Sequence, residues 1–252
     1  MNIGMLEVGP AHPCACVAEI GNAHNGNFSR AIRLLDAAKA AGASAAKLQT
    51  YTPAELVALR GNGPAPEPWG SQGWTMETLY EKARTPLEWI PLLFDHADGI
   101  GLPLFSSVFG AESLAVLEAA ECPAYKIARI DNKKTAVRQA ARLTGKPVLI
   151  SSDEPDVTNR LDAWLYCAPN YPTELKDVHL PYFPDAGYFG ISSHCLNLLL
   201  PIVAVARGAK MLEYHLQLDD EPSELEASVS LTASRFREMV ERVKRVEGML
   251  AA

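Results

Sequence analysis

The chain has 252 residues, enough for one α/β barrel or two smaller domains, and 48% hydrophobic with 21% charged residues excludes a disordered chain. Its 23 Lys and Arg residues against 30 Asp and Glu residues give a formal net charge of −7, which argues against nucleic acid as a partner. Five cysteines without a CxxC pair indicate reduced thiols. We find no signal peptide and no apolar run long enough to cross a bilayer, so we expect a cytoplasmic protein without a membrane partner.

Short apolar runs alternate with helical patterns along the chain. Several of these runs are too apolar for a half-exposed sheet, so they predict parallel strands that are buried on both faces. The eight predicted strands span residues 16–20, 45–49, 104–106, 124–127, 148–150, 164–167, 189–192 and 211–215. The predicted helices span residues 29–41, 86–97, 111–120, 135–144, 197–206 and 233–250.

This alternation predicts a single-domain (β/α)8 TIM barrel over residues 1–252, with an open doubly wound sheet as the alternative. Residues 152–163 are too few and too polar for an ordinary barrel helix, so we expect an eroded helix after the fifth strand. No GxGxxG or GxxxxGKS/T motif occurs, which weakens dinucleotide and nucleoside triphosphate interpretations. The Gly- and Pro-rich loop that carries Trp69 and Trp74 is either a substrate lid or a packed surface flap.

Polar residues gather at the carboxyl ends of the predicted strands, where (β/α)8 barrels place their active sites. The lysines, the arginine and the serine hydroxyls indicate a phosphorylated anion, because they supply positive charge and hydrogen-bond donors for phosphate oxygens. Two histidines on neighbouring strands suit Mn²⁺, Zn²⁺ or Fe²⁺ better than Mg²⁺. The strand-end residues are Glu19, Lys47, Gln49, Ser106, Ser107, Lys126, Arg129, Asp131, Ser151, Ser152, Ser192, Ser193, His194, Glu213 and His215.

These residues also have structural interpretations. Lys47 stands in an apolar run, and an unpaired buried ammonium costs several kcal/mol, so it should meet an anion. That anion is either a bound ligand or Glu19 in a structural ion pair. His194 and His215 are either metal ligands or hydrogen-bonded structural histidines.

Characteristic segments occur in order along nearly the whole chain. They are AEIGNAHNG (18–26), DAAKAAGA (36–43), KLQT (47–50), AYKIA (124–128), GKPVLIS (145–151), YPT (171–173), GISSH (190–194) and EYH (213–215). Together they resemble the N-acetylneuraminate (sialic acid) synthase family, and TLYEKARTPLEW (78–89) looks nearest to its pseudaminic and legionaminic acid synthase branches. The resemblance implies a (β/α)8 barrel that condenses phosphoenolpyruvate with the aldehyde form of a 2-acetamido sugar, giving a nonulosonic acid and inorganic phosphate.

The resemblance also implies roles for individual residues. Glu19 would act as acid and base, and with His194 and His215 it would form the catalytic set. The two histidines would bind a divalent metal, Mn²⁺ as in most relatives, with Mg²⁺, Co²⁺ and Zn²⁺ as alternatives. Phosphoenolpyruvate would be held by Lys47, Ser107, Lys126, Ser151 and Ser192. The acceptor would contact Gln49, Asp131, Tyr171 and, at the position of a late family aspartate, Glu224.

Several positions depart from the family pattern. They include Arg129, Asp153, Pro169, Ser193, Tyr214 and Glu224. Arg129 replaces a serine, and it resembles an arginine that contacts phosphoenolpyruvate in the related KDO-8-phosphate and DAHP synthases, so we assign it to the phosphoenolpyruvate site as well. The positions expected to bind phosphoenolpyruvate mostly keep the family residue, whereas several positions expected to bind the acceptor are changed. We therefore expect phosphoenolpyruvate chemistry with an altered aldehyde acceptor.

The resemblance also bears on partners. Relatives continue into a C-terminal antifreeze-like domain that covers the partner subunit's site, and we do not expect this domain within residues 1–252. A separate protein that replaces this lid and a homodimer through barrel helices are the expected protein partners. Two other functions remain as alternatives: a metal-dependent pyruvyl aldolase or lyase on the same barrel, and a non-catalytic barrel that binds a ligand or a partner.

Overall fold

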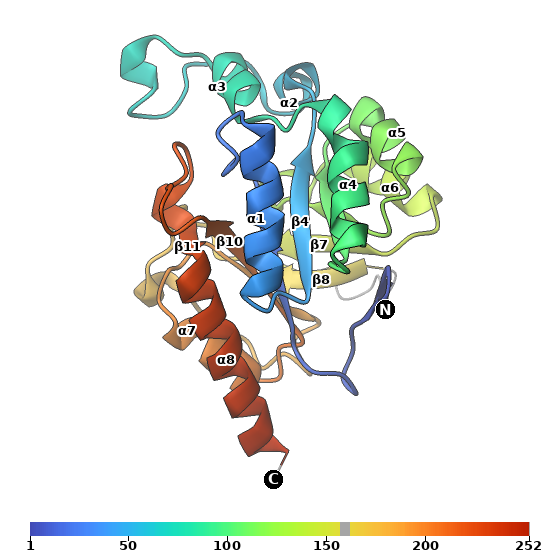
Figure 1. Cartoon of the computed structure of the whole chain (residues 1–252), viewed down its shortest axis with the longest axis vertical. Coiled ribbons are helices and arrows are strands. Elements are labelled where there is room, and N and C mark those ends of the chain that lie inside the picture. The colour runs from blue at the N-terminus through green and yellow to red at the C-terminus, as the bar shows by residue number, and fades with distance from the viewer. Residues whose placement is uncertain (157–161, 252) are drawn as a thin grey trace.

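Parallel strands in the centre of the molecule close into a ring. The computed structural model describes residues 1–156 and 162–251, and there β3 to β9 pair in chain order while β10 pairs with both β9 and β3. This arrangement confirms the predicted (β/α)8 barrel (Figure 1) and rules out the open sheet. The ring consists of β3 (Ala15–Glu19), β4 (Ala45–Thr50), β5 (Leu104–Val108), β6 (Tyr125–Ile127), β7 (Val148–Ser152), β8 (Asp162–Tyr166), β9 (Gly190–Ser193) and β10 (Met211–Gln217).

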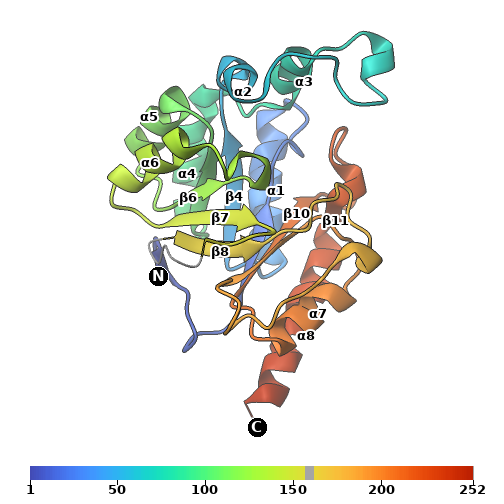
Figure 2. The same cartoon turned by 180° about the vertical axis from the view of Figure 1, so that it is seen from behind.

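Helices pack on the outside of this ring (Figures 1 and 2). In α1, the helix over Phe28–Ala40, the apolar residues Ala31, Leu34, Leu35 and Ala38 recur at helical spacing. One face of α1 is therefore apolar, and this face is buried in the main core. The apolar core therefore lies largely between the strands and the helices. The helices are α1 (Phe28–Ala40), α2 (Pro53–Arg60), α3 (Met76–Ala83), α4 (Ile90–Gly99), α5 (Ala111–Ala119), α6 (Thr135–Leu143), α7 (Leu199–Ala206) and α8 (Ala233–Leu250).

The helix predicted over residues 86–97 begins later, at Ile90, because residues 87–89 form a 3₁₀ turn, η2 (Leu87–Trp89). The hydroxyl of Thr85 contacts buried His24 at 3.2 Å instead of capping a helix. The other ring nitrogen of His24 accepts a hydrogen bond from Gly26 N–H at 3.0 Å. Burial lowers the pKa of His24 to about 4, so this histidine is neutral and fixes the loop after β3.

In the part of the chain that the structure describes, one side of the barrel carries less helix than the rest. Figure 2 shows β7 and β8 at the front with no described α-helix before them. Residues 153–156 form no helix, and the remainder of the predicted eroded helix, 157–161, lies outside the described residues. The β8–β9 connection contains one described helical turn, η4 (Leu175–Asp177). Aromatic side chains help to bury this side: Tyr166 packs edge-on against Tyr188, and the Arg138 guanidinium lies over the Trp164 ring.

Smaller elements complete the described structure. A hairpin, β1 (Asn2–Ile3) with β2 (Leu6–Glu7), lies near the N-terminus, and β11 (Ser230–Thr232) pairs in parallel with the end of β10. The loop with Trp69 and Trp74 contains the turn η1 (Gly70–Gln72) and projects beyond α3 (Figures 1 and 2). All five cysteines are buried free thiols. Among the described residues, no helix has the length and apolar character needed to span a membrane.

Close approach of two strands at the seam between β9 and β10 gives a stability prediction. A Cβ at Gly190 would lie 2.0 Å from the Met211 carbonyl oxygen and 2.8 Å from the Met211 backbone carbon and nitrogen, so the clash is with backbone that cannot easily shift. We expect Gly190→Ala to lower the free energy of unfolding by about 3 kcal/mol, the upper end of the usual overpacking cost, as measured by urea denaturation. Gly248→Ala, in open space on α8, is the control and should be neutral or stabilising by up to about 1 kcal/mol. Equal stabilities of the two variants would contradict this account of the seam.

Candidate active site

Two lysines lie side by side with two glutamates inside the barrel, near the carboxyl ends of its strands. Register explains the first pair, because Lys47 on β4 is the direct strand partner of Glu19 on β3, and the two side chains form an ion pair. Lys126 on β6 lies 3.2 Å from Glu213 on β10, and Lys47 lies 3.8 Å from the same carboxylate oxygen. All four side chains are buried, with at most 5% of any residue exposed. Lys47 therefore meets Glu19 in a buried ion pair, as its structural interpretation predicted.

Glu213 is the carboxylate that both lysines share, and no specific role was predicted for it from the sequence. Its Oε1 also accepts a hydrogen bond from Ser192 on the neighbouring strand at 2.7 Å. Burial alone would raise the pKa of Glu213, but Lys126 and Lys47 outweigh burial and lower it to about 2. The signal was available, since Glu213 stands in an apolar strand and needs a buried cation for the same reason that Lys47 needs an anion.

Serine hydroxyls lie next to the lysine ammonium groups, as the predicted phosphoenolpyruvate site requires. Lys47 donates to Ser107 at 3.0 Å, and Lys126 donates to Ser151 at 2.7 Å. The structure thus brings together five of the residues predicted to hold phosphoenolpyruvate: Lys47, Ser107, Lys126, Ser151 and Ser192.

Arg129 stands at the rim of this cluster rather than inside it. It opens the turn η3 (Arg129–Asp131), which begins two residues after the end of β6, and its side chain is 29% exposed. Asp153, which follows β7, accepts from Arg129 through both carboxylate oxygens, at 3.1 and 2.9 Å. The hydrogen bonds from Arg129 lower the pKa of Asp153. Two of the departures from the family pattern are therefore paired with each other.

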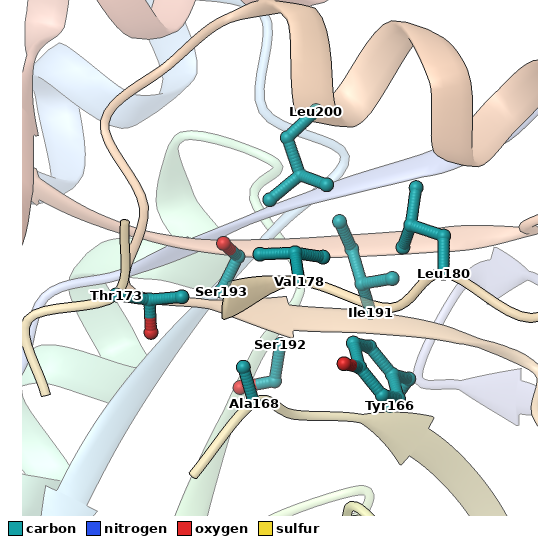
Figure 3. A pocket seen from close by; sticks show the side chains of 9 residues that line it. All are labelled: Tyr166, Ala168, Thr173, Val178, Leu180, Ile191, Ser192, Ser193 and Leu200. Carbon is teal, nitrogen blue, oxygen red and sulfur yellow. The ribbon is translucent and has the colours of Figure 1, made fainter. Parts of the chain in front are cut away.

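Ser192 and Ser193 lie on opposite sides of β9, because successive side chains of a strand alternate. Figure 3 shows Ser193 on the side of α7 and Leu200, while Ser192 lies on the other side near Ala168. Both residues line a narrow cavity that is otherwise mostly apolar. The Ser193 hydroxyl accepts from the Cys195 N–H at 3.1 Å. The departure at position 193 therefore lies in the layer between strand and helix, while Ser192 faces the buried charges.

The two predicted metal ligands face each other. His194 directly follows β9, His215 lies in β10, and their ring centroids are 5.3 Å apart. Burial and the neighbouring His215 lower the pKa of His194 to about 3, so it is neutral at physiological pH, as a metal ligand must be. Burial opposes protonation of His215, but the Glu226 carboxylate outweighs it and raises the pKa of His215.

The residues present fit a divalent metal as a pair of nitrogen ligands. Imidazole nitrogens suit Mn²⁺, Fe²⁺ and Zn²⁺, and the His194 and His215 rings lie close enough to share one ion. Within residues 1–156 and 162–251, no group of three or more His, Cys, Asp or Glu side chains is already arranged as a metal site.

The predicted acceptor residues fall in different surroundings. Gln49 donates to Glu19 at 3.2 Å, and the Tyr171 ring lies 4.5 Å from the His194 ring, so both are next to the buried cluster. Asp131 is buried in an ion pair with Arg60 of α2, which holds η3 in place. Glu224 is exposed to solvent.

The carboxylate that contacts His215 is Glu226, two residues after Glu224, and no role was predicted for it from the sequence. Its Oε2 lies 3.2 Å from His215 Nδ1, and its Oε1 accepts from the Tyr171 hydroxyl at 3.3 Å. It comes from the β10–β11 connection, where no strand pattern marks which side chain points inward. The run SELE offers two glutamates, and only the loop geometry distinguishes them.

A closed (β/α)8 barrel with buried charges and paired histidines at its strand ends defines a barrel enzyme. The model of the NeuB family matches residues 34–252, and the chain belongs to this family. This membership confirms the predicted relationship to sialic acid synthases.

Individual relatives agree with this assignment. The chain is 34% identical to a pseudaminic acid synthase of Helicobacter pylori over 92% of the chain and 74% of that protein. It is 28% identical to human N-acetylneuraminate-9-phosphate synthase over 97% of the chain and 73% of that protein. A sialic acid synthetase of Leptospira borgpetersenii, solved with citrate, shares the fold with a TM-score of 0.86 at 21% identity, covering 100% of this chain and 90% of that one. Both of these sequence relatives, the pseudaminic acid synthase and the human enzyme, are synthases, so the chain is an enzyme of the synthase type.

The carboxylate shared by two lysines gives a prediction for stability and its pH dependence. Glu213→Gln keeps the side-chain size but leaves Lys126 without its charge partner, so we expect roughly 3–5 kcal/mol less stability at pH 7. The pKa of folded Glu213 is about 2 against an ordinary 4.5, so its stabilisation is complete above pH 4.5 and is lost as the pH falls toward 2. Urea denaturation across this pH range measures both effects.

The control for this prediction is Glu238→Gln, which removes an exposed pair with Arg242 on α8. We expect it to change stability by less than about 1 kcal/mol at every pH. An effect of Glu213→Gln no larger than that of the control would show that Glu213 does not compensate the buried lysines.

Proposed function

We propose that the enzyme joins phosphoenolpyruvate to the open-chain aldehyde form of a sugar-like acceptor and releases inorganic phosphate. The observation that carries this proposal is the pair of buried lysines, Lys47 and Lys126, each bonded to a serine hydroxyl at a strand end. Phosphoenolpyruvate presents two anionic groups, a phosphate and a carboxylate, and ammonium and hydroxyl donors are suited to both. The names of the synthase relatives favour the same class of reaction.

The ion pairs inside the barrel favour the charged form of these lysines. Burial opposes it, but Glu19 and Glu213 outweigh burial and raise the pKa of Lys47, whereas burial lowers the pKa of Lys126 despite the neighbouring Glu213. Glu19 and Glu213 compensate Lys47 and Lys126, which would otherwise be two unpaired ammonium groups in a buried site. Glu213 engages the lysines through Oε1 only, and its Oε2 has no hydrogen-bond partner among the described residues. Arg129 at the rim adds a guanidinium whose planar fork can exchange the Asp153 carboxylate for a phosphate.

The residues of the cluster suit the bond changes of the reaction. The C2–C3 π electrons of phosphoenolpyruvate attack the aldehyde carbon through C3, and the electron-deficient C2 takes up water. The new alkoxide receives a proton and the added water gives one up. Collapse at C2 then forms the keto group and breaks the bond to phosphate. Glu19 is the proposed base for the water, with Oε1 held by Gln49 and Oε2 beside Lys47. The lysines would stabilise the departing phosphate.

His194 and His215 are the proposed ligands of a divalent metal, with Mn²⁺ as the first choice. When bound, such an ion supplies a Lewis acid for the aldehyde oxygen. The chain contributes the neutral state of His194 and the fixed orientation of His215 that such binding requires.

The acceptor is proposed to differ from the family's 2-acetamido sugar. Gln49 and Tyr171 lie beside the cluster, whereas Asp131 is engaged by Arg60 and Glu224 is exposed. The Arg129 and Asp153 pair also places charge at the rim, where the family pattern has neutral residues. More of the residues predicted for phosphoenolpyruvate than of those predicted for the acceptor lie at the buried cluster. This contrast supports an altered acceptor.

Phosphate release tests the proposal directly. The protein is incubated with phosphoenolpyruvate, Mn²⁺ and a panel of aldoses with and without acetamido groups, and inorganic phosphate is measured. We expect phosphate release that requires both phosphoenolpyruvate and one class of aldehyde. Absence of phosphoenolpyruvate binding in calorimetry, with Mn²⁺ and with chelator, would overturn the proposal. Cleavage or addition of pyruvyl compounds without phosphate release would favour the aldolase alternative instead.

Two substitutions test the donor site separately from turnover. Lys126→Ala should weaken phosphoenolpyruvate binding by at least about tenfold, because it removes a charge-assisted contact. Arg129→Ser, which restores the family residue, should weaken it by about tenfold if the guanidinium binds the phosphate. Calorimetry measures both, and Arg242→Ser on α8 is the control for loss of an arginine. Unchanged affinity in either variant would remove that residue from the site.

A further inference from the structure

The carboxylate of Glu226 has a partner for each of its oxygens, and every partner belongs to a different part of the site. Oε2 lies 3.2 Å from His215 Nδ1 and also accepts from the Asn22 N–H at 3.4 Å. Oε1 accepts from the Tyr171 hydroxyl at 3.3 Å. Only 8% of Glu226 is exposed, so these contacts replace most of its hydration.

The position of this carboxylate is fixed by the loop that bears it. Arg30 of α1 pairs with Glu221 at 2.7 Å and donates to the Pro222 carbonyl at 3.0 Å. The Ser223 N–H donates to Gln217 at 2.8 Å, and the Ser223 hydroxyl accepts from the Glu226 N–H at 3.0 Å. These bonds connect the loop to both α1 and β10, so Glu226 is presented by a braced segment and not by a free one.

A glycine makes room for the carboxylate. A Cβ at Gly21 would lie 2.4 Å from Glu226 Oε2, and Gly21 adopts a φ of +49° that favours glycine. The end of β3 and the β10–β11 connection are therefore built to let this one side chain approach His215.

Tyr171 links the two histidines through this carboxylate. Its ring lies 4.5 Å from the His194 ring while its hydroxyl holds Glu226, which in turn holds His215. Tyr171 comes from the β8–β9 connection and Glu226 from the β10–β11 connection. Two loops thus meet over the histidine pair.

We infer that Glu226 is the positioning residue for His215: it accepts the Nδ1 proton, fixes the tautomer and leaves Nε2 as the nitrogen that binds the metal. The inference rests on the proposed function, and it assigns to Glu226 a contact with a predicted metal ligand. Carboxylates that accept the second N–H of a metal-binding histidine fix its ring and raise its basicity, and their loss costs about 10- to 100-fold in metal affinity. Tyr171 positions Glu226 in the same way, one step further from the metal.

The chain offers a substitution that separates positioning from direct ligation. In Glu226→Gln, the amide oxygen can accept from His215 and Asn22 while the amide nitrogen donates to the Tyr171 hydroxyl. The hydrogen bond to His215 then persists without the negative charge. Glu226→Ala removes both the bond and the charge. Glu224→Ala removes an exposed carboxylate from the same loop and is the matched control.

The experiment measures Mn²⁺ binding by the electron paramagnetic resonance signal of free Mn²⁺, with urea denaturation to establish that each variant is folded. We expect Glu226→Ala to weaken Mn²⁺ binding by about 10- to 100-fold, Glu226→Gln to weaken it by less than about fivefold, and Glu224→Ala to leave it unchanged. Wild-type affinity in Glu226→Ala would overturn the inference. A loss in Glu226→Gln as large as in Glu226→Ala would also overturn it, because Glu226 would then act through its charge as a direct ligand.

Phosphoenolpyruvate binding and phosphate release by the wild-type protein are measured in parallel. Turnover by the wild type together with unchanged Mn²⁺ binding in Glu226→Ala would reject the role of Glu226 and leave the proposed function standing. No Mn²⁺ binding by the wild type would reject both the metal in the proposed function and the role of Glu226.

Discussion

Compensation of buried charge is the constraint on which the structure of the site depends. Lys47 and Lys126 are stable inside the barrel because Glu19 and Glu213 lie next to them, and removing one partner from such a group is far more costly than losing a surface ion pair. The constraint fixes strand register as well. Side chains alternate along a strand, so a slip of one residue between β3 and β4 would turn Lys47 toward the helices and leave Glu19 unpaired.

The lysine cluster lies on strands, whereas the residues that surround the histidine pair lie on loops. The lysines, their serines and Glu213 stand on strands whose positions are set by the closed sheet. Tyr171 and Glu226, which surround the histidine pair, stand on connections between strands. Loops accept substitution more readily than a closed sheet does, so a family can vary what it binds over the histidines while the strand-borne half stays the same.

The sequence was informative where an elementary rule applied to a single residue. Strands buried on both faces are apolar, so the eight strands and the barrel were predictable, and a lysine within such a strand had to meet an anion. The same rule applies to Glu213, which needs a buried cation, but it was applied only to Lys47 and the role of Glu213 was not predicted. No rule of this kind reaches Glu226, which depends on the path of a loop, or the Asp131 contact with Arg60, whose two residues are 71 positions apart in the chain. The late start of α4 followed from a tertiary contact, since the Thr85 hydroxyl contacts His24 instead of capping a helix.

Because Gly21 lies so close to Glu226, substitutions at these two distant positions of the chain are expected to be coupled in evolution. A side chain at position 21 collides with the carboxylate, so substitution there is tolerated only after position 226 has become shorter or has turned away. Loss of the glutamate removes this collision, and the φ of +49° at position 21 still favours glycine there. Sequences in which both positions have changed together should therefore outnumber those in which glycine alone has been lost.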